Sequence, residues 1–148
     1  MSELIRKQHN VSILLYHLVC VAKYRRVVFD EPEIDLTLKD ICFEIQKRYE
    51  LEFIEIGIDR DHVHFLVQSV PTMSATKIVR TIKSITAREM FIRQPKVKKH
   101  LWGGEFWTKG YYISTVGPHG DEDTIRKYVM NQGTEANYQP LYQSRLEL

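Results

Sequence analysis

A histidine-valine-histidine triplet at residues 62–64 lies in an apolar, β-rich run and suggests metal chemistry. Alternate residues of a strand project from one face, so a strand here would point His62 and His64 the same way and let both imidazoles share one cation. Two neutral imidazoles leave coordination positions open for phosphate oxygens and water, as a metal acting as a Lewis acid requires. Surface pairs of this type also arise by chance, so the triplet alone leaves metal binding open.

The surroundings of the triplet bear on which metal it would hold. No cysteine lies near it in the sequence, and structural zinc more typically recruits thiolates, so Mg²⁺ or Mn²⁺ fits better, with the imidazoles favouring Mn²⁺. Asp59 and Asp61 could orient the imidazoles through hydrogen bonds, but residues of a hairpin turn need no such role, and both interpretations stay open. His17, in another apolar run, is predicted to pack in the core.

Tyr128 and Gln132 form a second candidate pair, on a helix predicted late in the chain. Residues four apart share one helix face, so the amide oxygen of Gln132 could be a third metal ligand beside the phenol. A phenol is a weak nucleophile at neutral pH unless cations or a metal-bound phosphate assist it, and Arg126 and Lys127 precede Tyr128. Attack on a phosphodiester would give a 5′-phosphotyrosine and a free 3′-OH, and a second 3′-OH could reverse the step without ATP.

The hydrophobic pattern predicts the elements that must position these residues. In chain order they are a strand over 11–21, a helix over about 33–49 capped by Asp30, a hairpin of runs 51–58 and 62–70, a helix from the Ser74 cap to about Ile92, a β-rich aromatic run over 106–116, and a last helix that Asp121 or Asp123 caps and Gly133 ends. The β-α-β-β-α-β order is typical of ferredoxin-like and RNA-recognition-type folds. We therefore expect an α+β sandwich, an antiparallel sheet with helices on one side, plus a C-terminal catalytic helix.

Length and composition predict one domain over residues 1–148, with a core at about 10–133 and a tail at about 134–148. No stretch approaches the ~20 apolar residues that span a bilayer, and the N-terminus lacks a signal-peptide core, so we expect a cytoplasmic protein that acts on DNA. Cys20 and Cys42 have neither the number nor the spacing of a disulfide framework, and we expect buried thiols.

Basic residues are concentrated in one part of the chain. Nine basic and only two acidic residues lie between Thr72 and Gly110, which suits a polyanionic partner, although a solvated helix face followed by a basic loop would look the same. Trp107, Tyr111 and Tyr112 could stack on bases or pack in the core, and packing is favoured. The candidate nucleic-acid contacts are Lys23, Arg25, Arg26, Lys77, Arg80, Lys83, Arg88, Lys96, Lys98, Lys99 and Lys109.

Several short motifs, taken in order, resemble one known family. They are His17-Leu18-Val19, Lys23-Tyr24-Arg25-Arg26, Asp61-His62-Val63-His64-Phe65, Lys83-Ser84 to Arg88, Phe106-Trp107-Thr108-Lys109-Gly110-Tyr111-Tyr112, Thr115-Val116-Gly117, and Tyr128 with Gln132. The histidine triplet resembles the signature of the HUH superfamily. The ordered set, from about residue 10 to 133, is similar to the single-tyrosine transposases of the IS-two-hundred / IS-six-hundred-five insertion sequences, whose catalytic tyrosine and third metal ligand match Tyr128 and Gln132.

The resemblance implies a DNA transposase. It implies a homodimer whose sheets join, with the Tyr128 helix of one subunit serving the histidine pair of the other, and single-stranded hairpins at the ends of a mobile element as the DNA partner. Two other functions stay open: a domesticated repeat-associated transposase or replication-type nickase with the same chemistry, and a non-catalytic module that binds single-stranded nucleic acid. The last would not need His62, His64, Tyr128 and Gln132 together, so their joint presence counts against it.

Overall fold

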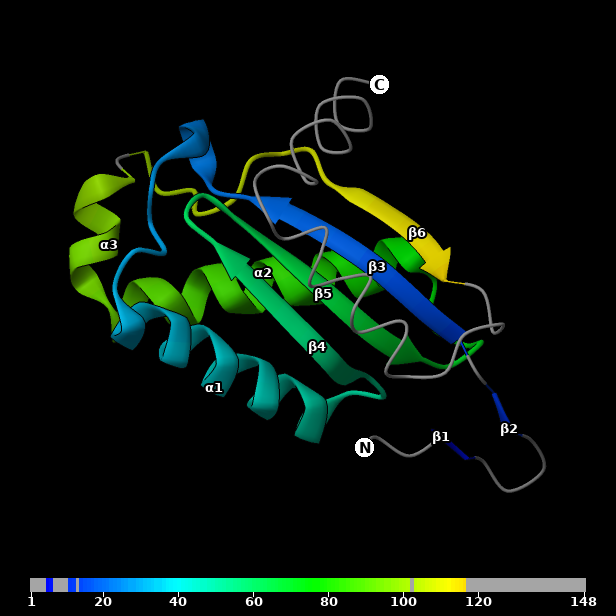
Figure 1. Ribbon diagram of the computed structural model, residues 1–148. Helices are drawn as coiled ribbons and strands as arrows, with labels where there is room; N and C mark the ends of the chain where they lie inside the picture. Colours follow the sequence, from blue (N-terminus) through cyan, green and yellow to red (C-terminus); the bar gives the residue numbers. More distant parts are fainter. Residues whose placement is uncertain (1–4, 7–10, 13, 102, 117–148) are drawn as a thin grey trace.

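One antiparallel sheet organises the fold. The structure is a computed structural model and describes residues 5–6, 11–12, 14–101 and 103–116. The main elements are β3 (Leu14–Val21), α1 (Pro32–Arg48), β4 (Glu52–Asp59), β5 (His62–Ser69), α2 (Ala75–Arg93), α3 (Pro95–His100) and β6 (Tyr112–Val116). The strands lie in the order β4-β5-β3-β6, and every neighbouring pair is antiparallel (Figure 1). The predicted split βαβ fold is confirmed.

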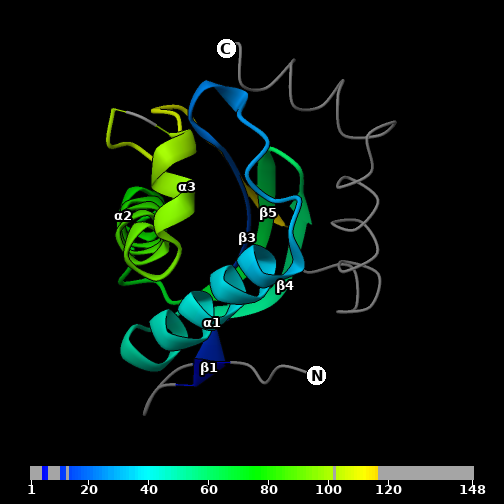
Figure 2. The ribbon, with the colours of Figure 1, turned by 90° about the vertical axis from the view of Figure 1, so that its left-hand side faces the viewer.

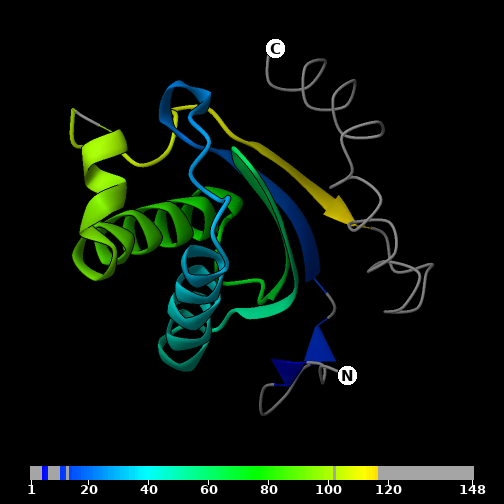
Figure 3. The same ribbon diagram turned by 60° about the vertical axis from the view of Figure 1, so that its left-hand side comes forward.

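Both long helices cover the same face of this sheet, as Figures 2 and 3 show from two neighbouring viewpoints. The core between them joins Leu18 and Phe65 from the strands to Leu38, Ile41 and Ile82 from the helices, and all five side chains are at most 1% exposed. Burying side chains of this size contributes about 1.5–3 kcal/mol each, so this layer holds the sheet in place. Cys20 and Cys42 lie in the same core as free thiols, as expected.

The N-cap of the first helix lies one residue later than predicted. Glu31, not Asp30, is the N-cap residue of α1; its side chain makes no capping hydrogen bond, and Pro32 takes the first helical position. Proline is favoured there because its missing N–H would have no partner inside the helix and its φ is already helical. The prediction of Asp30 as the cap was therefore wrong, although the helix itself is confirmed.

The second helix begins as predicted and leads into a short helix that the sequence analysis missed. Ser74 caps α2, since its Oγ accepts a hydrogen bond from the backbone N–H of Lys77 over 3.1 Å. The helix runs through Arg93, and Pro95 does not end helical structure but opens α3 as its first residue. The basic loop predicted here is in part this helix.

Two predicted strands are shorter in the structure. The run over 11–21 divides into β3 and β2 (Val11–Ser12), which pairs with β1 (Ile5–Arg6) in a separate two-stranded sheet. The aromatic run over 106–116 forms a strand only at β6, while Trp107 makes a single bridge to Ala22. The last predicted helix and the tail at 134–148 lie outside the described residues. None of the described helices is long and apolar enough to cross a bilayer.

Candidate functional site

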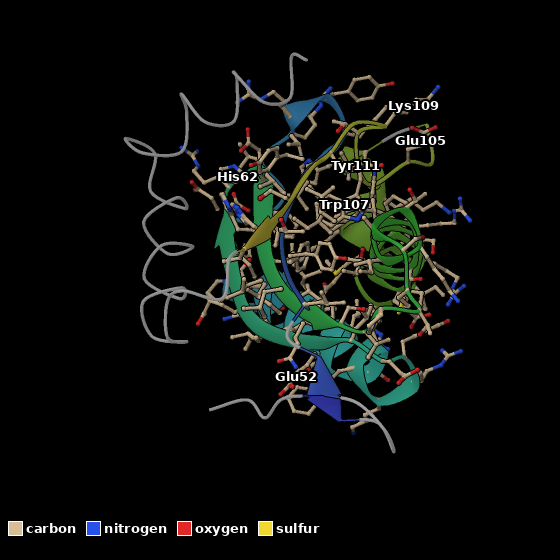
Figure 4. All side chains as sticks on the ribbon, turned by 90° about the vertical axis from the view of Figure 1, so that its right-hand side faces the viewer. Glu52, His62, Glu105, Trp107, Lys109 and Tyr111 are labelled. Carbon is tan, nitrogen blue, oxygen red and sulfur yellow. The ribbon has the colours of Figure 1, made fainter. Side chains whose placement is uncertain are left out.

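The histidine pair lies on a central strand, on the sheet face away from the helices. On β5, Val63 and Phe65 belong to the core under α1 and α2, so the alternating His62 and His64 project from the opposite face. Figure 4 shows His62 on the far side of the sheet from Trp107 and α2. The two imidazole centroids are 5.3 Å apart, and the side chains are 4% and 0% exposed. The predicted shared orientation is confirmed.

Asp61 fixes the ring of His62. Its Oδ1 lies 2.8 Å from His62 Nδ1, while Asp59 Oδ2 lies 3.6 Å from Nε2 on the other side of the ring. The hydrogen bond to His62 holds the pKa of Asp61 below its usual range against the opposing effect of burial, so Asp61 is a carboxylate that accepts from Nδ1–H. Arg25 Nε, 3.5 Å from Asp61 Oδ2, adds a favourable charge. Of the two interpretations of Asp61, the structure favours the one in which it orients the imidazole.

His64 is fixed by another histidine, His17 of β3. His17 Nε2 lies 2.7 Å from His64 Nδ1, and the two ring planes are within 13° of parallel, with centroids 5.0 Å apart. Burial lowers the pKa of His17 to about 4; burial, followed by the charges of His17 and His62, lowers the pKa of His64 to about 2. Both imidazoles are therefore neutral near pH 7, which is the form that can ligate a metal.

The described part of the site fits two ligands of a divalent metal. The Nδ1 atoms of His62 and His64 are engaged by Asp61 and His17, so Nε2 is the nitrogen of each ring that a metal would use. Metal-binding histidines commonly have their other ring nitrogen held in this way. Within the described residues, no group of three or more His, Cys, Asp or Glu side chains is arranged to hold a metal. The predicted third ligand Gln132 and the nucleophile Tyr128 lie outside the described residues.

Five of the eleven basic candidates interact within the protein. Lys83 Nζ donates to the carbonyl oxygens of Thr108 (2.7 Å) and Lys109 (3.2 Å), so this ammonium group holds the loop before β6. The other four form ion pairs: Lys23 with Glu105, Arg25 with Asp61, Arg88 with Glu89, and Lys96 with Glu31 and Glu33. Arg26, Lys77, Arg80, Lys98, Lys99 and Lys109 are exposed. Their role in DNA binding stays a prediction.

A pocket of about 480 Å³ lies between α2 and residues 104–111, on the helix side of the sheet. Arg80, Lys83 and Lys109 give it a cationic lining, and Tyr111, 38% exposed, forms part of its wall. In Figure 4, Lys109 and Tyr111 lie on the same side of the sheet as α2, and His62 lies on the opposite side. The pocket and the histidine pair are therefore two separate sites.

The aromatic run divides between packing and exposure. Trp107 is 5% exposed, its Nε1 donates to Thr86 Oγ1 over 2.9 Å, and its ring stacks on Phe29. Packing is thus confirmed for Trp107. Tyr112 lies edge-on to His17 at 5.9 Å. Tyr111 is exposed and Tyr112 is partly buried, so base stacking by these two rings stays a prediction.

Sequence reasoning assigned His17 to packing and missed its contact with His64. His17 shares one face of β3 with Val19, and Val19 lies directly opposite His64 on the neighbouring strand β5. The alternation along β3 was the part of this contact that the sequence contained. The register of β3 on β5 is set by tertiary pairing of strands far apart in the chain, so it could not be read from either segment alone.

The antiparallel sheet, with both long helices on one face and a buried histidine pair on the other, defines a split βαβ protein of the α+β class. The family described as "Transposase IS200 like" matches residues 10–132 of this chain. The chain therefore belongs to the IS200-like, single-tyrosine transposase family.

Named relatives agree with this assignment. The ISDra2 transposase TnpA of Deinococcus radiodurans is 37% identical over 130 residues, which cover 88% of this chain and 91% of the relative. The transposase for insertion sequence element IS200 of Salmonella typhimurium is 27% identical over 79% of this chain and 75% of its own length.

Two solved structures are similar in fold. A crystal structure of a transposase candidate from D. radiodurans R1 superposes with a TM-score of 0.69 at 33% identity, covering 86% of this chain and 97% of that one. A REP-associated tyrosine transposase bound to a REP hairpin gives a TM-score of 0.55 at 12% identity, covering 87% of this chain and 70% of that one, and so supports the fold alone.

Proposed function

We propose that this transposase cleaves and rejoins single-stranded DNA at the ends of an insertion sequence, with Tyr128 as nucleophile and His62, His64 and Gln132 as ligands of Mg²⁺ or Mn²⁺. The observation that supports this most strongly is the buried pair of imidazoles on one sheet face, each with its Nδ1 fixed by a hydrogen bond. A metal bound there would polarise the scissile phosphate and offset the charge that develops on its oxygens.

The chain's own residues account for the covalent step. The Tyr128 phenol oxygen attacks the phosphorus, the bond from phosphorus to the 3′ oxygen breaks, and the phenol proton is balanced by the proton that the departing 3′-OH gains. The product is a 5′-phosphotyrosine. Attack by the 3′-OH of another strand reverses the step and joins the two ends, because the phosphotyrosine keeps the energy of the original bond.

For the DNA partner we propose hairpins formed by the ends of the element. A protein of the same fold, the REP-associated tyrosine transposase, was solved bound to a REP hairpin, and here the exposed cations on α2 and around the pocket supply the charge that a phosphate backbone needs. Arg80 and Lys109 are the strongest candidates, since both are exposed and line the pocket. Hairpin binding and strand cleavage would then use opposite faces of the sheet.

We further propose a homodimer in which the histidine pair of one subunit works with Tyr128 of the other. β4 and β6 are the edge strands of the four-stranded sheet, so either could pair with a second copy. Mixing Tyr128→Phe with His64→Ala tests this: two inactive variants should regain strand cleavage together if the site is shared. Failure to complement would mean that each subunit uses its own tyrosine.

The activity itself is tested with single-stranded hairpin DNA from the ends of the element that encodes the chain. In the presence of Mn²⁺ a covalent protein–DNA adduct should appear on a denaturing gel, and a chelator should prevent it. Tyr128→Phe should abolish the adduct while hairpin binding remains. Hairpin binding without an adduct in the wild-type protein would instead indicate a non-catalytic binding module.

A further inference from the structure

His17 is placed to do more than fill space beside the histidine pair. It is 1% exposed, its Nε2 lies 2.7 Å from His64 Nδ1, and the two ring planes are within 13° of parallel. Tyr112 of β6 packs edge-on against the same ring, at 79°. Residues of three neighbouring strands therefore hold one nitrogen of His17 against one nitrogen of His64.

The contact between the two rings restricts where their hydrogens can be. A hydrogen bond between two neutral imidazoles has one donor and one acceptor. When His64 donates from Nδ1, its Nε2 carries a lone pair and can ligate a metal. When His17 donates from Nε2, His64 accepts at Nδ1 and carries its hydrogen on Nε2, where it blocks a metal.

We infer that His17 is a positioning residue that accepts the Nδ1–H of His64 and so presents Nε2 of His64 to the metal. This inference rests on the proposed function, because it assumes that the histidine pair holds the cation. His17 carries its own hydrogen on Nδ1 in this arrangement. It does not touch the metal or the DNA and acts only through His64.

The two metal-binding imidazoles are thus supported in different ways. His62 donates to a carboxylate, Asp61, that is 23% exposed, whereas His64 is 0% exposed and donates to a neutral ring. A second carboxylate at the buried position would be costly, since an isolated charge loses its hydration there. A neutral imidazole supplies the acceptor and the ring orientation without that cost.

The test compares two replacements of His17 in the full-length protein. His17→Phe keeps an aromatic ring but removes the acceptor, whereas His17→Gln offers an amide oxygen near the position of Nε2. Titration of Mn²⁺ by calorimetry, without DNA, should show affinity lowered about 10–100-fold in His17→Phe, the usual effect of losing such a partner. His17→Gln should recover most of the loss. Unchanged affinity in His17→Phe, or equal loss in both variants, would overturn the inference.

A measurement on the wild-type protein does not depend on how the variants fold. Long-range ¹H–¹⁵N NMR of the Mg²⁺-loaded protein should show His64 with its hydrogen on Nδ1. A hydrogen on Nε2 of His64 would overturn the inference even if the variants lose affinity.

Two controls separate this inference from the proposed function. If His62→Ala and His64→Ala abolish Mn²⁺ binding while His17→Phe leaves it unchanged, only the role of His17 is wrong. If neither His62→Ala nor His64→Ala affects Mn²⁺ binding, the metal centre is wrong and the role of His17 is wrong with it.

Discussion

Trp107 makes one buried hydrogen bond whose loss should have a measurable effect on stability. Its Nε1 donates to Thr86 Oγ1 over 2.9 Å, and the Thr86 hydroxyl gives its own hydrogen to the carbonyl of Ile82 over 2.6 Å. Thr86→Val keeps the shape of the side chain but removes the acceptor. Leaving a buried donor unsatisfied costs about 1–3 kcal/mol, so we expect Thr86→Val to lower the free energy of unfolding by that amount.

Urea denaturation of four proteins measures this term as a double-mutant cycle. In a Trp107→Phe background there is no indole N–H to leave unsatisfied, so Thr86→Val should cost less than about 0.5 kcal/mol. Thr76→Val, the same change at an exposed position of α2, is the matched control and should also stay within about 0.5 kcal/mol. An equal loss from Thr86→Val in both backgrounds would refute the reasoning.

Three further predictions concern the loop, the DNA surface and the metal centre. Lys83→Met should lower the free energy of unfolding by about 1–2 kcal/mol, because three loop carbonyls lose their charged donor, and the partial exposure of Lys83 limits the effect. Lys77→Met, at an exposed position, should change little in the same urea assay. Replacing Arg80 and Lys109 by alanine should weaken hairpin binding. In a plot of the logarithm of the association constant against the logarithm of the salt concentration, the slope should become shallower by about 0.7–0.9 for each lost phosphate contact. An unchanged slope in anisotropy titrations would exclude these residues from the interface. Asp61→Ala should weaken Mn²⁺ binding about 10–100-fold by calorimetry, and wild-type affinity would show that the carboxylate does not support His62.

The parts of the fold that the sequence predicted are those set by local pattern. The hairpin follows from two apolar runs around Asp59-Arg60-Asp61, and the start of α2 follows from the hydroxyl of Ser74. The shared face of His62 and His64 follows from strand period alone. These features need no knowledge of any other segment.

The parts that the sequence did not predict depend on contacts between distant segments. α3 was missed because a proline after a helical run predicts only the end of that helix, whereas Pro95 is the first residue of α3 and the buried Val97 holds this short helix against the core. Lys83 looked like a phosphate contact until the loop at 108–110 was placed against it. The partner of His64 depends on the register of β3 on β5, which no local pattern contains.

The central claim, that Tyr128 forms a phosphodiester bond with DNA, is tested most directly by locating the attachment site. After reaction with end-hairpin DNA and nuclease digestion, mass spectrometry of the tryptic peptide from Tyr128 to Arg145 should show a nucleotide adduct. That peptide also contains Tyr138 and Tyr142, so fragmentation must assign the residue. We predict the adduct on Tyr128, and its absence in His64→Ala. An adduct on Tyr138, on Tyr142 or on any other residue would contradict the claim.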